Sequence, residues 1–149
     1  MPEATAYNSA YHSDAEVAAV AAKFESCAFQ AAEFNHARHL TVLVWYLSRL
    51  SFEDAFEAMR ASILKFSRHH GKSGIYHQTV TVFWVRLVHD YIHQRTSVMP
   101  LYVLANEVIE RFSDKNLIYT YYSRDRLLSP EAKSGWIDPE LRPLGGLPP

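Results

Sequence analysis

Eight histidines are the side chains with the most chemistry to offer in this chain of 149 residues. With about 100° of rotation per residue in a helix, His36, His70 and His77 fall on helical faces made mostly of leucine, phenylalanine, valine and tryptophan. A neutral imidazole binds transition metals, and its charge changes near neutral pH, so that it also serves as an acid or a base. Their place on apolar faces therefore indicates a histidine site inside the protein.

The order of the expected helices brings these three histidines to one end of the fold. His36 begins one helix, His70 ends the next and His77 begins the one after that. Neighbouring helices of an up-down bundle run antiparallel, which places the start of one beside the end of the next. The turn over 72–74 is short, so His70 and His77 must be neighbours. We expect the three imidazoles to converge.

Convergence of three imidazoles predicts a metal centre. Such a set can hold Zn²⁺, Fe²⁺, Ni²⁺ or Cu²⁺ and leave a position open for water or substrate. The leading hypothesis is a small metalloenzyme that acts on a small organic molecule, with a divalent transition metal bound by His36, His70 and His77. His39 and Tyr76 are expected to transfer protons or to support the ligands.

Two alternative functions fit the same residues. In the first, the protein is a metal-free lyase or isomerase, and the histidines act as acid and base in an apolar pocket. In the second, it is a non-catalytic interaction protein that binds a partner through exposed tyrosines and its C-terminal segment. Glu33 stands three residues before His36 and joins the site only if that helix begins early enough.

A second pair of histidines has the spacing of a zinc-protease helix. His89 and His93 are four residues apart, but Asp90 stands where such proteases have their catalytic glutamate. The helical periodicity places both rings on a polar arc, and we interpret them as a solvated pair. The chain contains neither a glycine-rich nucleotide-binding motif nor the Gly-x-Ser-x-Gly motif of serine hydrolases.

Charge and composition limit the partners. The chain has 15 Lys and Arg against 16 Asp and Glu, so its net charge of −1 does not favour nucleic acid or an anionic membrane. No apolar run approaches the roughly 20 residues that cross a bilayer, the start lacks the features of a signal peptide, and Cys27 is the single cysteine. We expect a cytoplasmic domain with a small-molecule substrate; the many aromatics are compatible with a homodimer.

Apolar periodicity predicts an all-α fold, a four- to five-helix bundle with a C-terminal arm packed across it. Helices are expected at about 14–32, 35–50, 52–70, 75–95 and 100–112. Residues 1–12 are expected to form a flexible lead-in, 13–122 the bundle and 123–149 the arm. The arm is rich in proline, but Trp136 and its neighbours are too apolar for a free tail.

Three stretches of the chain resemble a group of small bacterial helical proteins without characterised activity. They are Phe34-Asn35-His36 with His39-Leu40, then Tyr76-His77 with Thr79, Thr81 and Trp84, then Tyr122-Ser123-Arg124 with Arg126-Leu127 and Ser129-Pro130-Glu131-Ala132. The resemblance extends from about residue 33 to residue 143. It implies that the C-terminal arm is an integral part of the domain, and it implies no reaction or cofactor.

Overall fold

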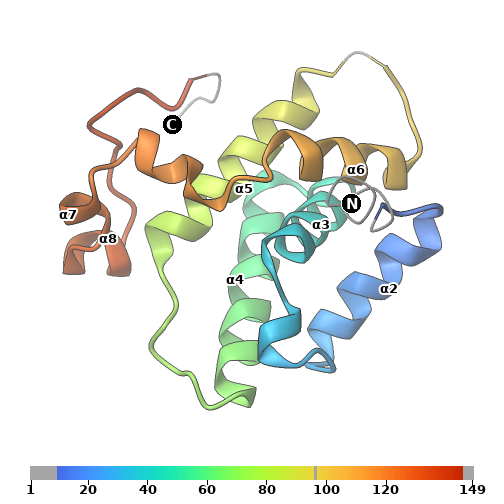
Figure 1. Ribbon diagram of the computed structural model, residues 1–149, viewed down its shortest axis with the longest axis horizontal. Helices are drawn as coiled ribbons and strands as arrows, with labels where there is room; N and C mark the ends of the chain where they lie inside the picture. The colour runs from blue at the N-terminus through green and yellow to red at the C-terminus, as the bar shows by residue number, and fades with distance from the viewer. Residues whose placement is uncertain (1–9, 96, 146–149) are drawn as a thin grey trace, which may run out of the picture.

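The computed structural model describes residues 10–95 and 97–145, and over these residues the regular structure is helical (Figure 1). The main helices are α2 (Asp14–Glu25), α3 (His36–Leu47), α4 (Phe52–His69), α5 (Gln78–His93) and α6 (Leu101–Arg111). Shorter elements are η1 (Ala31–Glu33), η2 (Lys115–Thr120), α7 (Arg124–Leu127) and α8 (Pro130–Ser134). The predicted all-α bundle is confirmed. None of the described helices is both long and apolar enough to cross a membrane.

Three of the main helices begin where serine or asparagine offers a capping side chain. Ser13, Asn35 and Ser51 each accept a hydrogen bond from a backbone N–H in the first turn of α2, α3 and α4. These bonds satisfy donors that have no partner within the helix. In α2 the side chain of Glu16 accepts a hydrogen bond from the Ser13 N–H in return, which completes a capping box.

The end of α2 differs from the prediction, because the helix stops at Glu25 instead of continuing to about residue 32. Cys27 has a φ of 61°, the left-handed conformation that usually falls to glycine. The N–H groups of Cys27 and Ala28 donate to the carbonyls of Phe24 and Lys23, the two bonds of a Schellman motif. A cysteine gives no sequence signal for such an end.

The end of α4 does follow its sequence signal. His70 is the C-cap, and Gly71, with a φ of 68°, occupies the left-handed position after it. The N–H groups of Gly71 and Lys72 donate to the carbonyls of Arg68 and Ser67. A Cβ atom added at Gly71 would meet nothing within 4 Å, so only the backbone conformation requires glycine there.

Replacing Gly71 with alanine should lower the free energy of unfolding by about 1 kcal/mol, because alanine is strained at positive φ. Urea denaturation of the full chain measures this. Gly135→Ala is the matched control: Gly135 has a φ of −156°, and its added Cβ would lie at an ordinary 3.9 Å from the Glu131 carbonyl oxygen. Equal losses for the two variants would show that backbone conformation is not the cause.

The core surrounds α3, which packs against α2, α4, α5 and α6. Leu40, Val42, Leu43 and Val44 of this helix have no exposed surface. The chain before α2 joins this packing: the Tyr11 hydroxyl lies 2.9 Å from Thr41 Oγ1, and the Tyr11 N–H and carbonyl bond the Asn106 side chain. The end of the expected flexible lead-in is therefore packed; its residues 1–9 lie outside the described part.

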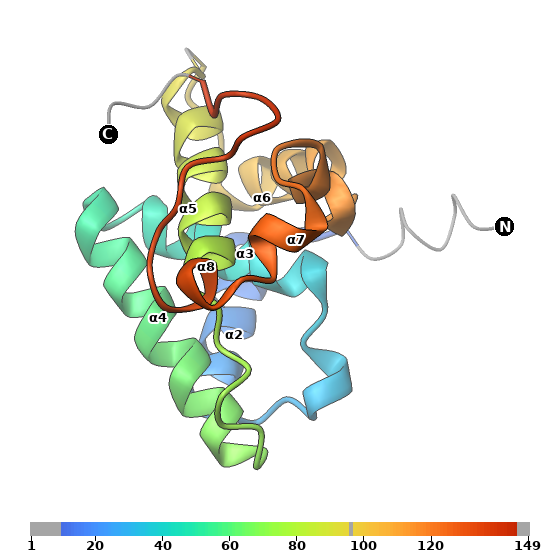
Figure 2. The same ribbon diagram turned by 90° about the vertical axis from the view of Figure 1, so that its left-hand side faces the viewer.

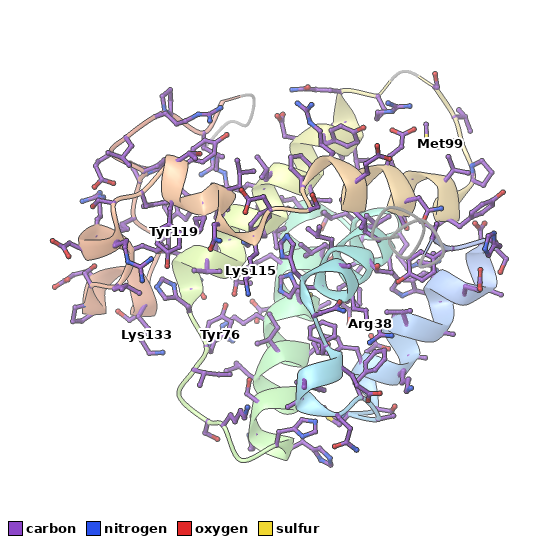
Figure 3. The ribbon with its side chains drawn as sticks, viewed as in Figure 1. Arg38, Tyr76, Met99, Lys115, Tyr119 and Lys133 are labelled. Atoms are coloured by element: carbon purple, nitrogen blue, oxygen red, sulfur yellow. The ribbon has the colours of Figure 1, made fainter. Side chains whose placement is uncertain are left out.

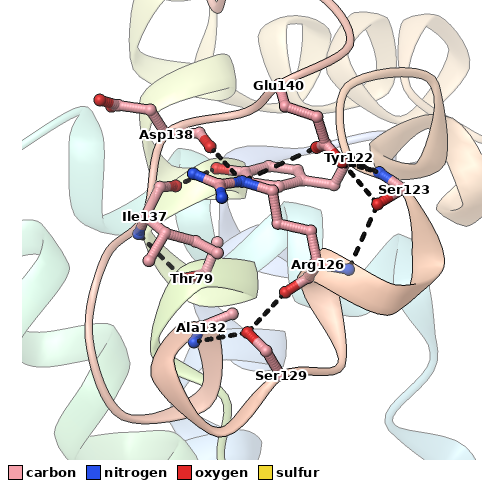
Figure 4. A network of polar contacts seen from close by, with 9 residues as sticks. All are labelled: Thr79, Tyr122, Ser123, Arg126, Ser129, Ala132, Ile137, Asp138 and Glu140. Carbon is pink, nitrogen blue, oxygen red and sulfur yellow. Dashed lines mark hydrogen bonds and ion pairs between the residues drawn. The ribbon is translucent and has the colours of Figure 1, made fainter.

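The C-terminal arm runs along α5, with α8 packed on that helix (Figure 2). The buried Thr79 hydroxyl of α5 donates to the Gly135 carbonyl at 2.8 Å and accepts from the Ile137 N–H at 3.3 Å. Tyr122, the residue that precedes the arm, is fully buried, and its hydroxyl donates to the Ile137 carbonyl at 2.6 Å (Figure 4). The arm thus satisfies polar groups of the bundle and packs over it. Its residues 146–149 lie outside the described part.

Candidate ligand pocket and its histidines

A cavity of about 300 Å³ lies among α2, η1, α4 and the loop that leads to α5. These elements meet at one end of the molecule, at the bottom of Figure 1. The apolar side chains of its wall include Phe24, Phe34, Ile63, Phe66, Ile75 and Val80. Four of the five residues predicted for the site also line it: His39, His70, Tyr76 and His77.

Three phenylalanines form a continuous aromatic part of the wall. The rings of Phe24 and Phe34 are stacked with centroids 4.0 Å apart, and Phe66 lies 5.3 and 5.5 Å from them. The His70 ring is 4.4 Å from Phe66, and the His39 ring is 5.9 Å from Phe34. The two imidazoles therefore border an apolar surface, where hydrogen bonds to a ligand are stronger than in water.

His36 lies outside the pocket lining, although it was predicted as a ligand of the same metal. Its Nε2–H donates to the Phe112 carbonyl at 2.8 Å, and its ring meets Trp84 with centroids 4.7 Å apart. Burial lowers the pKa of His36, opposed by the hydrogen bond to Phe112. The ring joins the start of α3 to the end of α6.

His77 has both ring nitrogens occupied. Nδ1 accepts a hydrogen bond from the Val80 N–H at 3.2 Å, which makes His77 the N-cap of α5. Nε2 lies 2.7 Å from the Leu127 carbonyl oxygen, and since a carbonyl only accepts, Nε2 carries the proton. The ring therefore connects α5 to the end of α7.

Among the described residues, only one ring nitrogen of His70 has a hydrogen-bond partner. Its Nε2 lies 3.0 Å from the Phe29 carbonyl oxygen and must donate to it. In the neutral ring Nδ1 is then the nitrogen with the lone pair. This fixed tautomer resembles the arrangement by which a backbone carbonyl orients a functional histidine.

The structure thus does not bring His36, His70 and His77 together as one ligand set. Their Nε2 atoms bond three different carbonyls, because the α6 end, the loop after α2 and the α7 end each present one to them. Within residues 10–95 and 97–145, no three His, Cys, Asp or Glu side chains form a group that could hold a metal. Glu33 is exposed in η1 and accepts the Gln30 N–H. Binding of a divalent transition metal stays a prediction.

His39 is a polar residue of the wall whose ring has no hydrogen-bond partner among residues 10–95 and 97–145. Burial and, to a smaller extent, the neighbouring His36 ring lower the pKa of His39 from 6.5 to about 4. At neutral pH the His39 ring is therefore uncharged, with one donor and one acceptor nitrogen.

The pKa of His39 makes the stability depend on pH. Between about pH 6.5 and pH 4, His39 binds a proton in the unfolded chain but not in the folded protein. This residue therefore does not reduce the free energy of unfolding above pH 6.5, and it reduces it increasingly as the pH falls. We expect a slope of up to about 1.4 kcal/mol per pH unit from this residue. Urea unfolding at several pH values measures it. His39→Leu should flatten the slope, whereas His69→Leu, an exposed control, should not; equal slopes in all three proteins would contradict this account.

Tyr76 is held at the edge of the pocket by its neighbours. Its hydroxyl donates to Gln78 Oε1 at 2.7 Å, and burial raises its pKa, so it remains a neutral phenol. From α8, the Lys133 ammonium donates to the carbonyls of Gly74 and Tyr76 (Figure 3). The arm therefore fixes the loop that carries one wall of the cavity.

The second histidine pair lies at the other end of α5. The rings of His89 and His93 are stacked with centroids 4.0 Å apart. His93 is exposed, as predicted, but His89 is half-buried, with its ring 5.2 Å from Phe52 and its Nδ1 buried without a partner. Of the two histidines expected to be solvated, only His93 is therefore exposed.

Comparison of the chain with protein-family models, with curated proteins and with solved structures found no match in any of the three. The resemblance to small bacterial helical proteins stays a prediction. The class of protein is therefore defined by the fold and the pocket alone: an all-α domain with an aromatic-walled cavity bordered by histidines.

Proposed function

We propose that the protein binds a small, largely apolar organic molecule in this pocket, with His39 as the hydrogen-bond partner of the polar group of the ligand. The observation that supports this most directly is an imidazole in the wall of an aromatic cavity that is hydrogen-bonded by none of the described residues. An apolar cavity with a few polar groups is typical of small-molecule sites, and about 300 Å³ is at the small end of their range. His39 is partly buried and lines the cavity, so a ligand there would lie against its ring.

A second candidate is a metal-free lyase or isomerase that moves a proton on the bound molecule. The fixed tautomer of His70 favours it, because Nδ1 is free to accept a proton while the Phe29 carbonyl holds the ring in place. Tyr76 lines the same cavity, and its hydroxyl, whose proton goes to Gln78, could accept a hydrogen bond from the ligand. A pKa of about 4 makes the His39 nitrogen a poor proton acceptor at neutral pH.

A ligand screen on the full chain tests the binding proposal. Thermal-shift measurements find binders among small aromatic and aliphatic compounds, and NMR of the imidazole Cε1–H groups locates them. We expect binders to shift the signals of His39 and His70 and to leave that of exposed His93 unchanged. Binders that shift only His93 or other remote signals would contradict the proposal.

Two tryptophan variants provide a matched control. Ile63 lines the cavity, and Ile63→Trp should fill it and weaken binding at least tenfold. Leu128 is 61% exposed and lies outside the lining, so Leu128→Trp should bind as the parent does. If a binder is also converted to product, loss of turnover in His70→Gln with retained binding would support the enzyme; retained turnover would exclude His70 as the base.

A further inference from the structure

The charge of the pocket wall is of one sign. Among the described residues that line the cavity, Lys72 is the one with a permanent charge, and none is an aspartate or a glutamate. Lys72 is exposed, and no carboxylate of the described chain lies within ion-pair distance of its ammonium. A cation at the edge of an apolar cavity attracts an anion and disfavours a second cation.

The backbone at Lys72 is fixed by the end of α4. Its N–H donates to the Ser67 carbonyl at 2.7 Å as part of the turn that Gly71 makes possible. His70, two residues earlier, borders the same cavity and has its ring held by the Phe29 carbonyl. The chain thus brings a cation and an imidazole to the lining of a cavity whose aromatic wall is formed by Phe24, Phe34 and Phe66.

We propose that the ligand of this pocket is a small amphipathic anion, an organic carboxylate with an aromatic or branched apolar body. Lys72 would pair with the carboxylate, and the phenylalanine rings would cover the body. This inference rests on the binding proposed above and narrows its ligand class. An ion pair with an exposed lysine is screened by water, so the carboxylate should bind roughly three- to fivefold more tightly than a neutral analogue.

Three probes that share the same apolar body and differ only in their polar group test this proposal. We would measure the binding of 3-phenylpropanoate, 3-phenylpropan-1-ol and 3-phenylpropylamine to the full chain by NMR titration at pH 7, and repeat the series with benzene rings on shorter linkers. The expected order is carboxylate, alcohol, amine, with roughly three- to fivefold between the first two. Added salt should reduce the preference, because Lys72 is exposed.

Two lysine variants identify the origin of any preference. Lys72→Gln should remove most of it without affecting folding, since the side chain is exposed. Lys115→Gln should leave it unchanged, because Lys115 is exposed on η2 and lies outside the lining. A preference that survives in Lys72→Gln overturns the proposed pairing.

The same experiment separates this inference from the proposed function. If carboxylate, alcohol and amine bind equally and Ile63→Trp blocks all three, the pocket binds small molecules but the anion inference fails. If the amine binds most tightly, the inference fails as well. If no compound of either series binds in a way that Ile63→Trp weakens, both proposals fail.

Discussion

Removal of residues 129–149 is expected to lower the free energy of unfolding by more than about 3 kcal/mol. The cut deletes Trp136, which packs edge-on to Tyr122 with centroids 6.3 Å apart, and the fully buried Ala132. It also removes the carbonyl partners of the Thr79 and Tyr122 hydroxyls. This loss is costly because both residues are buried in the intact chain. Lost burial and lost hydrogen bonds therefore act in the same direction.

Chemical denaturation and thermal melting of the shortened chain measure this loss, and an unchanged melting curve would show that the arm contributes nothing. If the shortened chain does not fold, point variants of the full chain take its place. Thr79→Val should cost about 1 kcal/mol or more, because it leaves the Gly135 carbonyl and the Ile137 N–H without their partner. Asp125→Ala, at an exposed position of α7, is the control and should have little effect.

The boundaries of the helices could be predicted from the sequence wherever a residue type marks the start or the end of a helix. Ser13, Asn35 and Ser51 mark helix starts through their capping groups, and Gly71 marks an end through its left-handed backbone. The missed end of α2 shows the limit of such signals. At Cys27 the backbone adopts the same left-handed conformation without the residue type that usually reveals it.

The site was predictable to the extent that it depends on one short connection. His70 and His77 are brought to the same cavity by the turn between α4 and α5, as their spacing predicted. His36 was misplaced because helical periodicity gives the face of a ring but not the acceptor that it meets. Backbone carbonyls at element ends, such as those of Phe112 and Leu127, carry no mark in the sequence, and they determine where the rings of His36 and His77 point.

His77→Ala is expected to lower the free energy of unfolding by about 2–4 kcal/mol. The substitution removes the N-cap of α5, which is the Val80 N–H bond to Nδ1, and a lost cap costs about 1 kcal/mol. It also leaves the Leu127 carbonyl without its donor, at about 1–3 kcal/mol. Urea denaturation measures the sum, and His93→Ala, at an exposed position of the same helix, should change little.

A third variant separates this structural role from the role of metal ligand that the sequence predicted for His77. Asparagine is a good N-cap but is too short to replace the bond to Leu127, so His77→Asn should be intermediate between alanine and the parent. The expected order of stability is histidine, asparagine, alanine, and it should be the same with and without a chelator. Equal losses for alanine and asparagine that disappear when EDTA is added to all three proteins would instead indicate that the ring holds a metal, because only metal-dependent stability is sensitive to a chelator.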